Sequence, residues 1–406
     1  MAVPTPPRQL VPYHLDERNT NLLEYFCYNV FSSMGSSMGK CCDGLVKFHN
    51  ILHRLALLDE SLSTKAVLEA ILALSSLHRH GRRPEAMRLK LSALRTLGIS
   101  SSRELGAIEG IQHVVAGMLL CYYEVHPGII GAIQDIHDTP FQWMSYVCGS
   151  KIIMQVLDLR KQFFSSEFSV IFDWVDYHFT IGLFTFRHWR QPCRTMMLMQ
   201  GVDDQGMQNL TCMKTRVLEI YDSSQAIIGL FYELVMTIKR PTDDGYFSDE
   251  YTMAMDHLER RIGDVVTASD TTSSTSGKPF DLGMKIYQIM VLIYLERASR
   301  NFSGQSDKIT SLVERGFKVM EQLDTFNGPL PLFILGLEAR TDQQRMFIID
   351  TIERSAALSR LRSLETVGRL LQAAWIQDDL DTENDVDYVL KLDTLISSNP
   401  IMPTLA

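Results

Sequence analysis

The stretch from Lys65 to Glu124 constrains the fold most, because three successive segments in it carry apolar residues at the spacing of α-helices. The first, residues 65–78, is apolar on almost every face and rich in Ala and Leu, which predicts a buried helix. The second, residues 86–97, has an apolar stripe opposite basic residues and should cover one face of the first. The third, residues 111–124, is again apolar. The sequence therefore predicts a core of three packed helices.

Helical patterns also occur outside this stretch. In the third core segment, Ala116 and Gly117 are small enough to let a neighbouring helix approach closely. No strand-like alternation of polar and apolar residues is sustained anywhere, and no fixed-period repeat occurs. We therefore expect an all-α fold, a large helical array without a sheet. The further predicted helices are residues 21–26, 48–58, 141–159, 173–189, 213–239, 284–300 and 308–323, with two or three more after the break at Gly328 and Pro329, around Phe333, Phe347, Leu361 and Trp375.

Two segments are predicted to be irregular. Residues 1–20 are polar and rich in proline, which indicates a flexible tail, and Asn19 or Thr20 could cap the helix that follows. Residues 268–279 contain seven Ser or Thr and predict a flexible surface loop. This loop is either a phosphorylation segment or a solvated insertion between helices. We expect residues 21–406 to form a single all-α domain.

Charge and cysteine content narrow the class of protein. The net charge of −9 gives the chain no general attraction to phosphate, so unaided DNA binding is not expected. Seven cysteines are an odd number, and most lie in apolar helical patterns, as reduced thiols of an intracellular protein do. The prolines near Met1 replace the apolar run of a signal peptide, and no apolar stretch is long enough to span a membrane. We therefore predict a soluble protein of the nucleus or cytoplasm.

Several of these helices carry a family resemblance. The sequence Ala-Ile-Leu-Ala-Leu-Ser-Ser-Leu-His at residues 70–78 is followed by Ala86-x-x-x-Lys-x-x-Ala-Leu-x-x-Leu and Met118-Leu-Leu-x-Tyr-Tyr-Glu. Together they resemble the all-helical regulatory domain of fungal zinc-cluster transcription factors, in the second of its two large classes. The resemblance covers nearly the whole chain, from about Leu22 onward, because further matching stretches follow in the expected order: Trp143-x-x-Tyr, Asp173-Trp-Val-Asp-Tyr-His, Arg187-His-Trp, Ile228-Gly-Leu, Ile293-Tyr-Leu-Glu and Pro331-Leu-Phe-Ile-Leu-Gly.

The resemblance implies a transcriptional regulator rather than an enzyme. Family members that lack their own zinc cluster resemble nuclear regulators of fungal secondary-metabolite clusters, including those for mycotoxins of the trichothecene type. The expected partners are a DNA-binding transcription factor or the transcription machinery. A small-molecule effector and a homodimer are also compatible with the resemblance.

The zinc cluster of that family is not found in these 406 residues. Such a cluster needs closely spaced pairs of thiolates, and the chain has no Cys-x-x-Cys. Cys41 and Cys42 are adjacent, a poor geometry for binding one metal ion. Direct sequence-specific DNA binding is therefore not expected. Either the natural protein lacks the cluster or an upstream exon encodes it, and the sequence leaves both alternatives open.

Other site motifs are weak. Residues 35–40 resemble a phosphate-binding loop, but the spacing is one residue short and Cys41 stands where a Ser or Thr should bind magnesium. Residues 378–387 hold six acids but do not match a calcium loop. Three interpretations of this acidic segment stay open: a magnesium site of a terpene cyclase-like enzyme, an exposed loop, or a surface that recruits transcription machinery through Trp375, Ile376, Leu380 and Tyr388.

Histidines and basic clusters give no stronger site. His78 and His80 do not share a helical face, and His178 and His188 are typical of core or interface histidines among aromatic residues. The basic clusters at residues 79–83 and 187–190 would contact phosphate or lie at solvated helix ends. We therefore predict no catalytic, cofactor-binding or metal-binding residue and no cofactor. The favoured function is a transcriptional regulator, and the alternative is an all-α enzyme such as a terpene cyclase-like protein.

Overall fold

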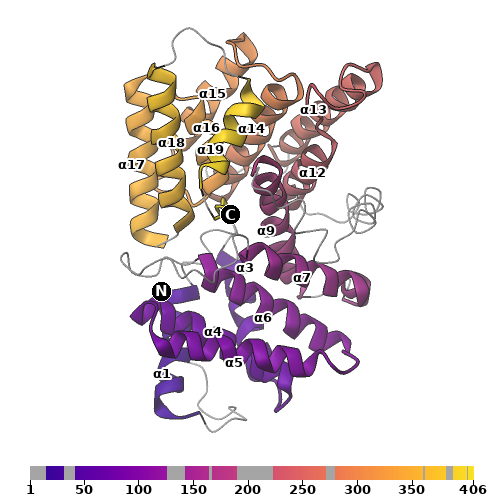
Figure 1. The fold of residues 1–406 in the computed structure, drawn as a ribbon, viewed down its shortest axis with the longest axis vertical. Coiled ribbons are helices and arrows are strands. Elements are labelled where there is room, and N and C mark those ends of the chain that lie inside the picture. The colour runs from indigo at the N-terminus through magenta and orange to yellow at the C-terminus, as the bar shows by residue number, and fades with distance from the viewer. Residues whose placement is uncertain are drawn as a thin grey trace. The chain divides into compact units, whose positions relative to one another are not determined.

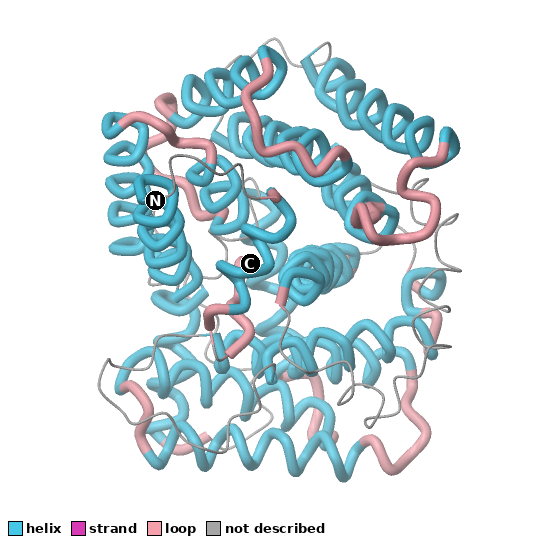
Figure 2. Tube along the Cα trace, turned by 45° about the horizontal axis from the view of Figure 1, so that its top comes forward, coloured by secondary structure: helices cyan, strands magenta, loops and turns pink. Residues whose placement is uncertain are grey.

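The computed structural model describes residues 15–31, 42–125, 142–163, 167–189, 223–270, 279–359, 362–380, 387–399 and 401–406. In these ranges the regular elements are helices and no strand occurs (Figure 2), which confirms the all-α prediction. The chain divides into two compact units, Met1–Phe179 with Ser359–Arg362 and Thr180–Leu358 with Ser363–Ala406. We call them the N-unit and the C-unit.

The N-unit contains the three core helices that the sequence predicted. Helix α4 packs against both α5 and α6, and α6 packs against α7 (Figure 1). The described elements of the N-unit are α1 (Glu17–Tyr25), the π-helix η1 (Phe26–Val30), α3 (Cys42–Ala56), α4 (Leu62–His80), α5 (Pro84–Ser100), α6 (Ala107–Val125), α7 (Gln142–Val156), α8 (Leu159–Gln162) and the first part of α9 (Ser169–His188).

Local chemistry defines the ends of α4. The hydroxyl of Ser61 accepts a hydrogen bond from the backbone N–H of Thr64 at 3.2 Å, which satisfies a donor at the start of the helix. Gly81 ends the helix with φ of +74°, a conformation that glycine adopts at little cost. Between these ends the apolar side chains are buried on nearly every face, so α4 is the centre of the N-unit core.

Small residues set the distance between α6 and α7. Ala116 is fully buried, and a Cβ atom added at Gly117 would lie 2.8 Å from the Ser150 hydroxyl of α7. The Ser150 hydroxyl donates across the contact to the carbonyl of Val114 at 3.3 Å. The predicted close approach at Ala116 and Gly117 is therefore confirmed.

Aromatic side chains complete the core of each unit. In the N-unit the rings of Phe48 and Trp174 meet edge to face with centroids 5.0 Å apart. In the C-unit Phe184 of α9 packs against Tyr294, 5.0 Å away, and against Phe231, 5.8 Å away. These edge-to-face and tilted pairs are the favoured arrangements of buried rings.

The C-unit contains the second part of α9 and a further set of helices. Helix α14 lies at its centre, because it packs against its neighbours α12, α13, α15, α16 and α19. The described helices are α12 (Ser223–Thr237), α13 (Asp249–Asp270), α14 (Pro279–Ser299), α15 (Asp307–Met320), α16 (Pro329–Leu337), α17 (Asp342–Ser359), α18 (Arg362–Leu380) and α19 (Tyr388–Ser397).

Two predicted boundaries were wrong. The first helix is capped by Asp16, whose carboxylate accepts from the N–H of Asn19, so neither Asn19 nor Thr20 is the cap. Residues 17–20 are consequently helical and not part of a tail, while residues 1–14 lie outside the described ranges. The helix predicted to reach Leu159 ends at Val156, because Asp158 adopts a positive φ of 47° before α8 begins.

Other differences concern the C-unit. Helix α12 ends at Thr237, before Pro241, and residues 213–222 of the predicted helix lie outside the described ranges. Helix α13 was not predicted, and the described residues after Gly328 form four helices, not two or three. Of the predicted loop at residues 268–279, the first three residues belong to α13 and Pro279 begins α14, while residues 271–278 are not described.

Within the described ranges, no helix is both long and apolar enough to span a membrane.

Candidate functional site

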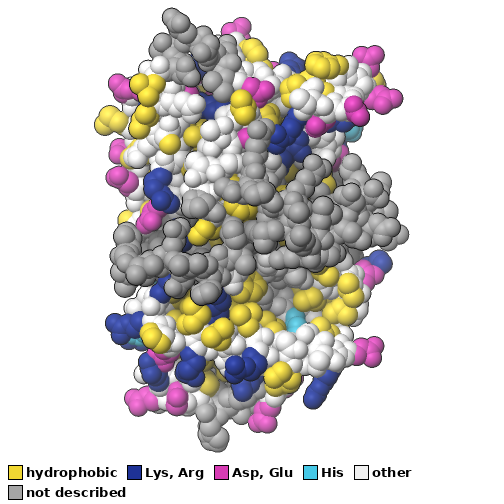
Figure 3. Space-filling view, in the orientation of Figure 1, with side chains coloured by type: hydrophobic (Ala, Val, Ile, Leu, Met, Phe, Trp, Pro, Cys, Tyr) yellow, Lys and Arg dark blue, Asp and Glu magenta, His cyan; other side chains and the backbone are white. Residues whose placement is uncertain are grey.

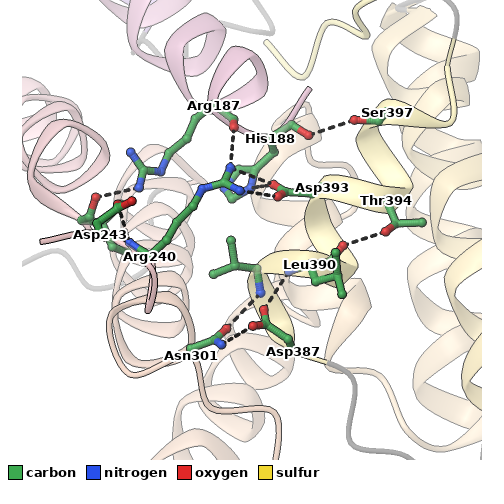
Figure 4. A network of polar contacts seen from close by, with 12 residues as sticks. Arg187, His188, Arg240, Asp243, Asn301, Asp387, Leu390, Asp393, Thr394 and Ser397 are labelled. Carbon is green, nitrogen blue, oxygen red and sulfur yellow. Dashed lines mark hydrogen bonds and ion pairs between the residues drawn. The ribbon is translucent and has the colours of Figure 1, made fainter. Parts of the chain in front are cut away.

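A buried polar cluster of the C-unit surrounds Asp393 on α19 (Figure 4). Its other members come from the end of α9, from the segment after α12 and from α14. Helices far apart in the sequence therefore meet at one carboxylate. We call Arg187, His188, Arg240, Tyr294 and Asp393 the Asp393 network.

Both oxygens of Asp393 have a partner. The side chain is fully buried, and its Oδ1 lies 2.8 Å from Nδ1 of His188. Its Oδ2 accepts from Nη1 of Arg240 at 2.9 Å. A carboxylate without such partners would be costly to hold away from water, so the guanidinium and the imidazole make this burial tolerable.

The contacts of His188 define its tautomer. Because the Asp393 carboxylate only accepts, Nδ1 of His188 carries the proton and donates it. Nε2 then accepts from the hydroxyl of Tyr294 at 3.0 Å. Burial lowers the pKa of His188, and the hydrogen bond to Asp393 opposes this shift. Burial raises the pKa of Tyr294, so its hydroxyl stays protonated and donates.

The two arginines bind backbone as well as side chains. Arg240 donates through Nη2 to the carbonyl of Arg187 at 3.2 Å, which joins it to the last turn of α9. Arg187 itself donates to the carbonyls of Val235 and Ile238, at 3.4 and 2.6 Å. These carbonyls lie where α12 ends, so Arg187 satisfies acceptors that the helix leaves free. This contact gives a physical reason why α12 ends at Thr237, before Pro241.

The two ends of α19 are also held by polar contacts. At its start, Asp387 accepts from the N–H of Leu390 at 2.8 Å and from the side-chain amide of Asn301 (Figure 4). At its end, the hydroxyl of Ser397 donates to the carbonyl of His188 at 3.2 Å. Trp189 adds a bond from Nε1 to the carbonyl of Asn399, also 3.2 Å long. Helix α19 is therefore joined to α9 and to the segment that follows α14 by directional bonds along its length.

This arrangement is suited to holding helices in one register. Both nitrogens of His188 are engaged, and the imidazole and Asp393 are at most 1% exposed. The imidazole therefore presents no free nitrogen to a substrate in this structure. Removal of one partner would leave another charge buried without compensation, so the network specifies one packing of α9, α14 and α19.

A second buried ion pair joins α14 to the end of α16. Arg297 donates to both carboxylate oxygens of Glu338, at 2.9 and 2.7 Å, and both side chains are nearly inaccessible to solvent. A third guanidinium nitrogen donates to the carbonyl of Phe302 at 3.0 Å. The planar guanidinium suits this bidentate pairing, which lysine could not reproduce. Sequence patterns did not single out this pair or Asp393 and Arg240, and Tyr294 was noted only within the stretch Ile293-Tyr-Leu-Glu of the family resemblance.

The acidic segment is only partly described. Asp379 accepts two bonds from Arg345 at 2.9 and 3.0 Å, and this contact lowers the pKa of Asp379. Asp378 pairs with Lys391. Asp387 caps α19, and residues 381–386 lie outside the described ranges. The described acids of this segment thus have partners within the C-unit.

The apolar contacts expected beside this segment need correction. Trp375 is buried and donates through Nε1 to the carbonyl of Gly336 at 2.9 Å, and Tyr388 is also buried. Only Ile376 and Leu380 are exposed, at 61% and 80%. Two of the four side chains proposed to contact transcription machinery therefore belong to the core.

The predicted histidines and basic clusters have mainly structural contacts. His178 is buried, its Nδ1 lies 2.9 Å from the carbonyl of Trp174, and burial lowers its pKa to about 4. His78 lies 2.9 Å from the Tyr25 hydroxyl, and Arg79 covers the same ring. Because Arg187 binds carbonyls of α12 and the following segment, its predicted role as a phosphate contact or solvated helix end was wrong.

Three cysteines, Cys27, Cys121 and Cys148, are free thiols of low reactivity. Cys121 is buried, and burial raises the pKa of Cys27 and of Cys148 to about 11, so these thiols stay protonated at neutral pH. Within the described ranges, no three His, Cys, Asp or Glu side chains cluster as metal ligands would. Cys41 and residues 35–40 are not described.

Comparisons with known proteins agree on one family. The profile of the fungal specific transcription factor domain matches residues 21–397. A relative described as transcription factor iacI, from Pestalotiopsis fici, is 31% identical over 393 residues, which are 95% of this chain and 94% of the relative. No solved structure matches. Since both the profile and the relative span nearly the whole chain, the protein belongs to the family of the fungal specific transcription factor domain.

Proposed function

We propose that this protein controls a fungal secondary-metabolite gene cluster, of the mycotoxin type, and that it reaches its promoters through a DNA-bound partner. The carrying observation is the family match over residues 21–397 in a chain without a Cys-x-x-Cys pair. The net charge of −9 supports the same proposal, because an acidic surface is repelled by the DNA backbone. We propose that the protein acts in the nucleus and that a fraction of it is also found in the cytoplasm.

The proposal treats residues 21–406 as one regulatory domain, with the Ser/Thr-rich segment 268–279 on its surface. A small-molecule effector and a homodimer are part of the same proposal. No described residue favours the enzyme alternative, because the described acids of segment 378–387 pair with Arg345, Lys391 and Asn301 and do not cluster as metal ligands.

The test is the transcript profile of a deletion strain, with reintroduction of the full chain as its control. We expect a block of neighbouring biosynthetic genes to lose its transcripts together and to regain them on reintroduction. Unchanged transcripts combined with the loss of one metabolic step would contradict a regulator and indicate an enzyme.

A further inference from the structure

Helix α5 presents an exposed face on which arginines and apolar residues alternate. Arg88 and Arg95 are exposed, and Met87, Leu91 and Ile99 are 38%, 53% and 50% exposed. These five residues, which we call the α5 outer face, recur at spacings of three or four residues and so share one side of the helix. Met87 and Ile99 lie ~18 Å apart along the axis at 1.5 Å per residue.

The surface view agrees with this pattern. Where α5 lies in Figure 1, Figure 3 shows dark blue and yellow side chains interleaved. In a chain with a net charge of −9, such a basic and apolar surface is a local exception. Exposed apolar side chains rimmed by charge are typical of protein interaction sites.

The opposite side of α5 is held firmly. Ala86, Leu89 and Ala93 are buried, and Lys90 reaches inward to Glu124 at 2.6 Å. Glu69 of α4 accepts from the hydroxyls of Ser92 and Thr96, at 2.8 and 2.9 Å. The outer face is therefore pre-ordered, and a ligand would not have to order it on binding.

The acids near this face are already engaged. Glu85 pairs with Arg18, Glu69 binds the two hydroxyls, and Glu124 binds Lys90. In the described part of the chain, the structure gives Arg88 and Arg95 no ion pair. Their charge is available to a ligand.

We propose that the α5 outer face binds an acidic amphipathic helix of a partner protein. Arg88, Leu91, Arg95 and Ile99 follow one another turn by turn, so a helix with acidic and apolar residues alternating in the same way would match both charge and shape. The inference rests on the proposed function, because it gives the chemistry of the partner through which the protein acts.

The same face fits other polyanions less well. Nucleic-acid surfaces contact phosphate with Arg and Lys, and the three exposed apolar side chains beside the arginines would have no partner there. A helix that lies in a membrane surface needs a broad apolar face, whereas the broad apolar face of α5 is buried against α4 and α6. A protein helix satisfies both kinds of side chain.

Binding of a defined probe by the full chain tests the proposal. The probe is a synthetic helical peptide with glutamate and leucine alternating turn by turn on one face, and the readout is fluorescence anisotropy at low and moderate salt. We expect the double variant Arg88→Glu/Arg95→Glu to weaken binding about tenfold or more and to reduce its salt dependence. Leu91→Ala should weaken binding several-fold.

Matched variants on other helices serve as controls. Arg315 on α15 and Met346 on α17 are exposed, so Arg315→Glu and Met346→Ala should leave binding unchanged. Arg88→Gln/Arg95→Gln, checked for helix content by circular dichroism, repeats the test with a milder change. Unchanged binding in the double variants, or an equal loss in the controls, would overturn the proposal. Equal or tighter binding of duplex DNA or anionic vesicles through the same arginines would also overturn it.

The inference and the proposed function can fail separately. If deletion of the gene lowers cluster transcripts but Arg88→Gln/Arg95→Gln leaves promoter occupancy intact, the regulator is supported and this face is not its partner site. If no transcript depends on the gene, the proposed function is wrong, and the peptide measurement still decides whether the face binds an acidic helix.

Discussion

Asp393 is a buried carboxylate with two different kinds of partner, a neutral imidazole and a guanidinium. Of the two, only Arg240 carries a charge that balances it, and Arg240 is about one quarter exposed. The hydrogen bond from His188 adds direction rather than charge. Replacement of Asp393 by asparagine would therefore leave the Arg240 cation facing a neutral, buried amide. It would also remove the carboxylate that joins α19 to α9.

Asp393→Asn should destabilise the protein by about 3 kcal/mol, because the change breaks a buried ion pair and leaves its partner in place. For a unit of this size that loss lowers the unfolding midpoint by about 6–12 °C. Differential scanning calorimetry of the full chain measures it. The control is Asp324→Asn, at an exposed position, which should leave the midpoint within about 1 °C. Equal midpoints for the two variants would mean that the network stabilises nothing.

His178 predicts a pH dependence of stability. Its pKa is lowered to about 4 in the folded protein by burial, against an ordinary value of 6.5. The unfolded chain therefore binds the proton first, so stability is complete above about pH 6.5 and falls as the pH drops toward 4. Between pH 7 and pH 5 the loss from this group is about 2 kcal/mol.

His178→Gln should remove that part of the pH dependence, at the cost of lower stability at pH 7. Urea unfolding at pH 7 and at pH 5 gives both values. The exposed His257 supplies the comparison, because His257→Gln should leave the difference between the two pH values unchanged. If His178→Gln keeps the full acid sensitivity, protonation of other groups causes it.

At the scale of helices, the strongly apolar α4 and α6 could be predicted from the sequence, whereas the more polar α13 could not. Helices α4 and α6 bury side chains on almost every face, so their patterns are unmistakable. Helix α13 buries only a narrow stripe, Tyr251, Met255, Leu258 and Ile262, about one residue per turn among charged neighbours. Such a stripe is weak evidence in a sequence and becomes a helix because α12 and α14 cover it.

Long-range polar contacts explain the other differences. His188 and Asp393 are 205 residues apart, and no local pattern indicates that they pair. The end of α12 likewise depends on Arg187, which lies on another helix. By contrast, the prediction of no catalytic, cofactor-binding or metal-binding residue rested on local motifs alone. The aromatic neighbours Trp174 and Tyr177 of His178 were predictable because they lie on the same helix, whereas Tyr122 comes from α6.

The α6–α7 contact gives a prediction about helix packing. Gly117→Ala should destabilise the protein by about 1–3 kcal/mol, because the added methyl group overlaps the Ser150 hydroxyl and disturbs its bond to Val114. Gly98→Ala on α5 is the matched change, since a Cβ there meets no atom within 4 Å. It should stabilise the protein by up to about 1 kcal/mol. Urea unfolding of both variants measures the difference, and the reverse order would show that α6 and α7 are loosely packed.

At the scale of the whole molecule, two compact helical units carry the sequence of one family domain. Each unit has its own aromatic core, and the described polar clusters have structural contacts. On the proposed function the protein acts through an interaction surface, and we propose the α5 outer face of the N-unit as that surface. We propose that the protein acts at promoters without reading DNA itself.

Chromatin immunoprecipitation of the tagged full-length protein tests that claim most directly, in strains with and without the DNA-binding factor that co-precipitates with it. We predict occupancy at the promoters of the affected gene block in the first strain and its loss in the second. Occupancy that persists without any such factor, together with specific binding of the purified protein to the same promoter DNA, would contradict the account.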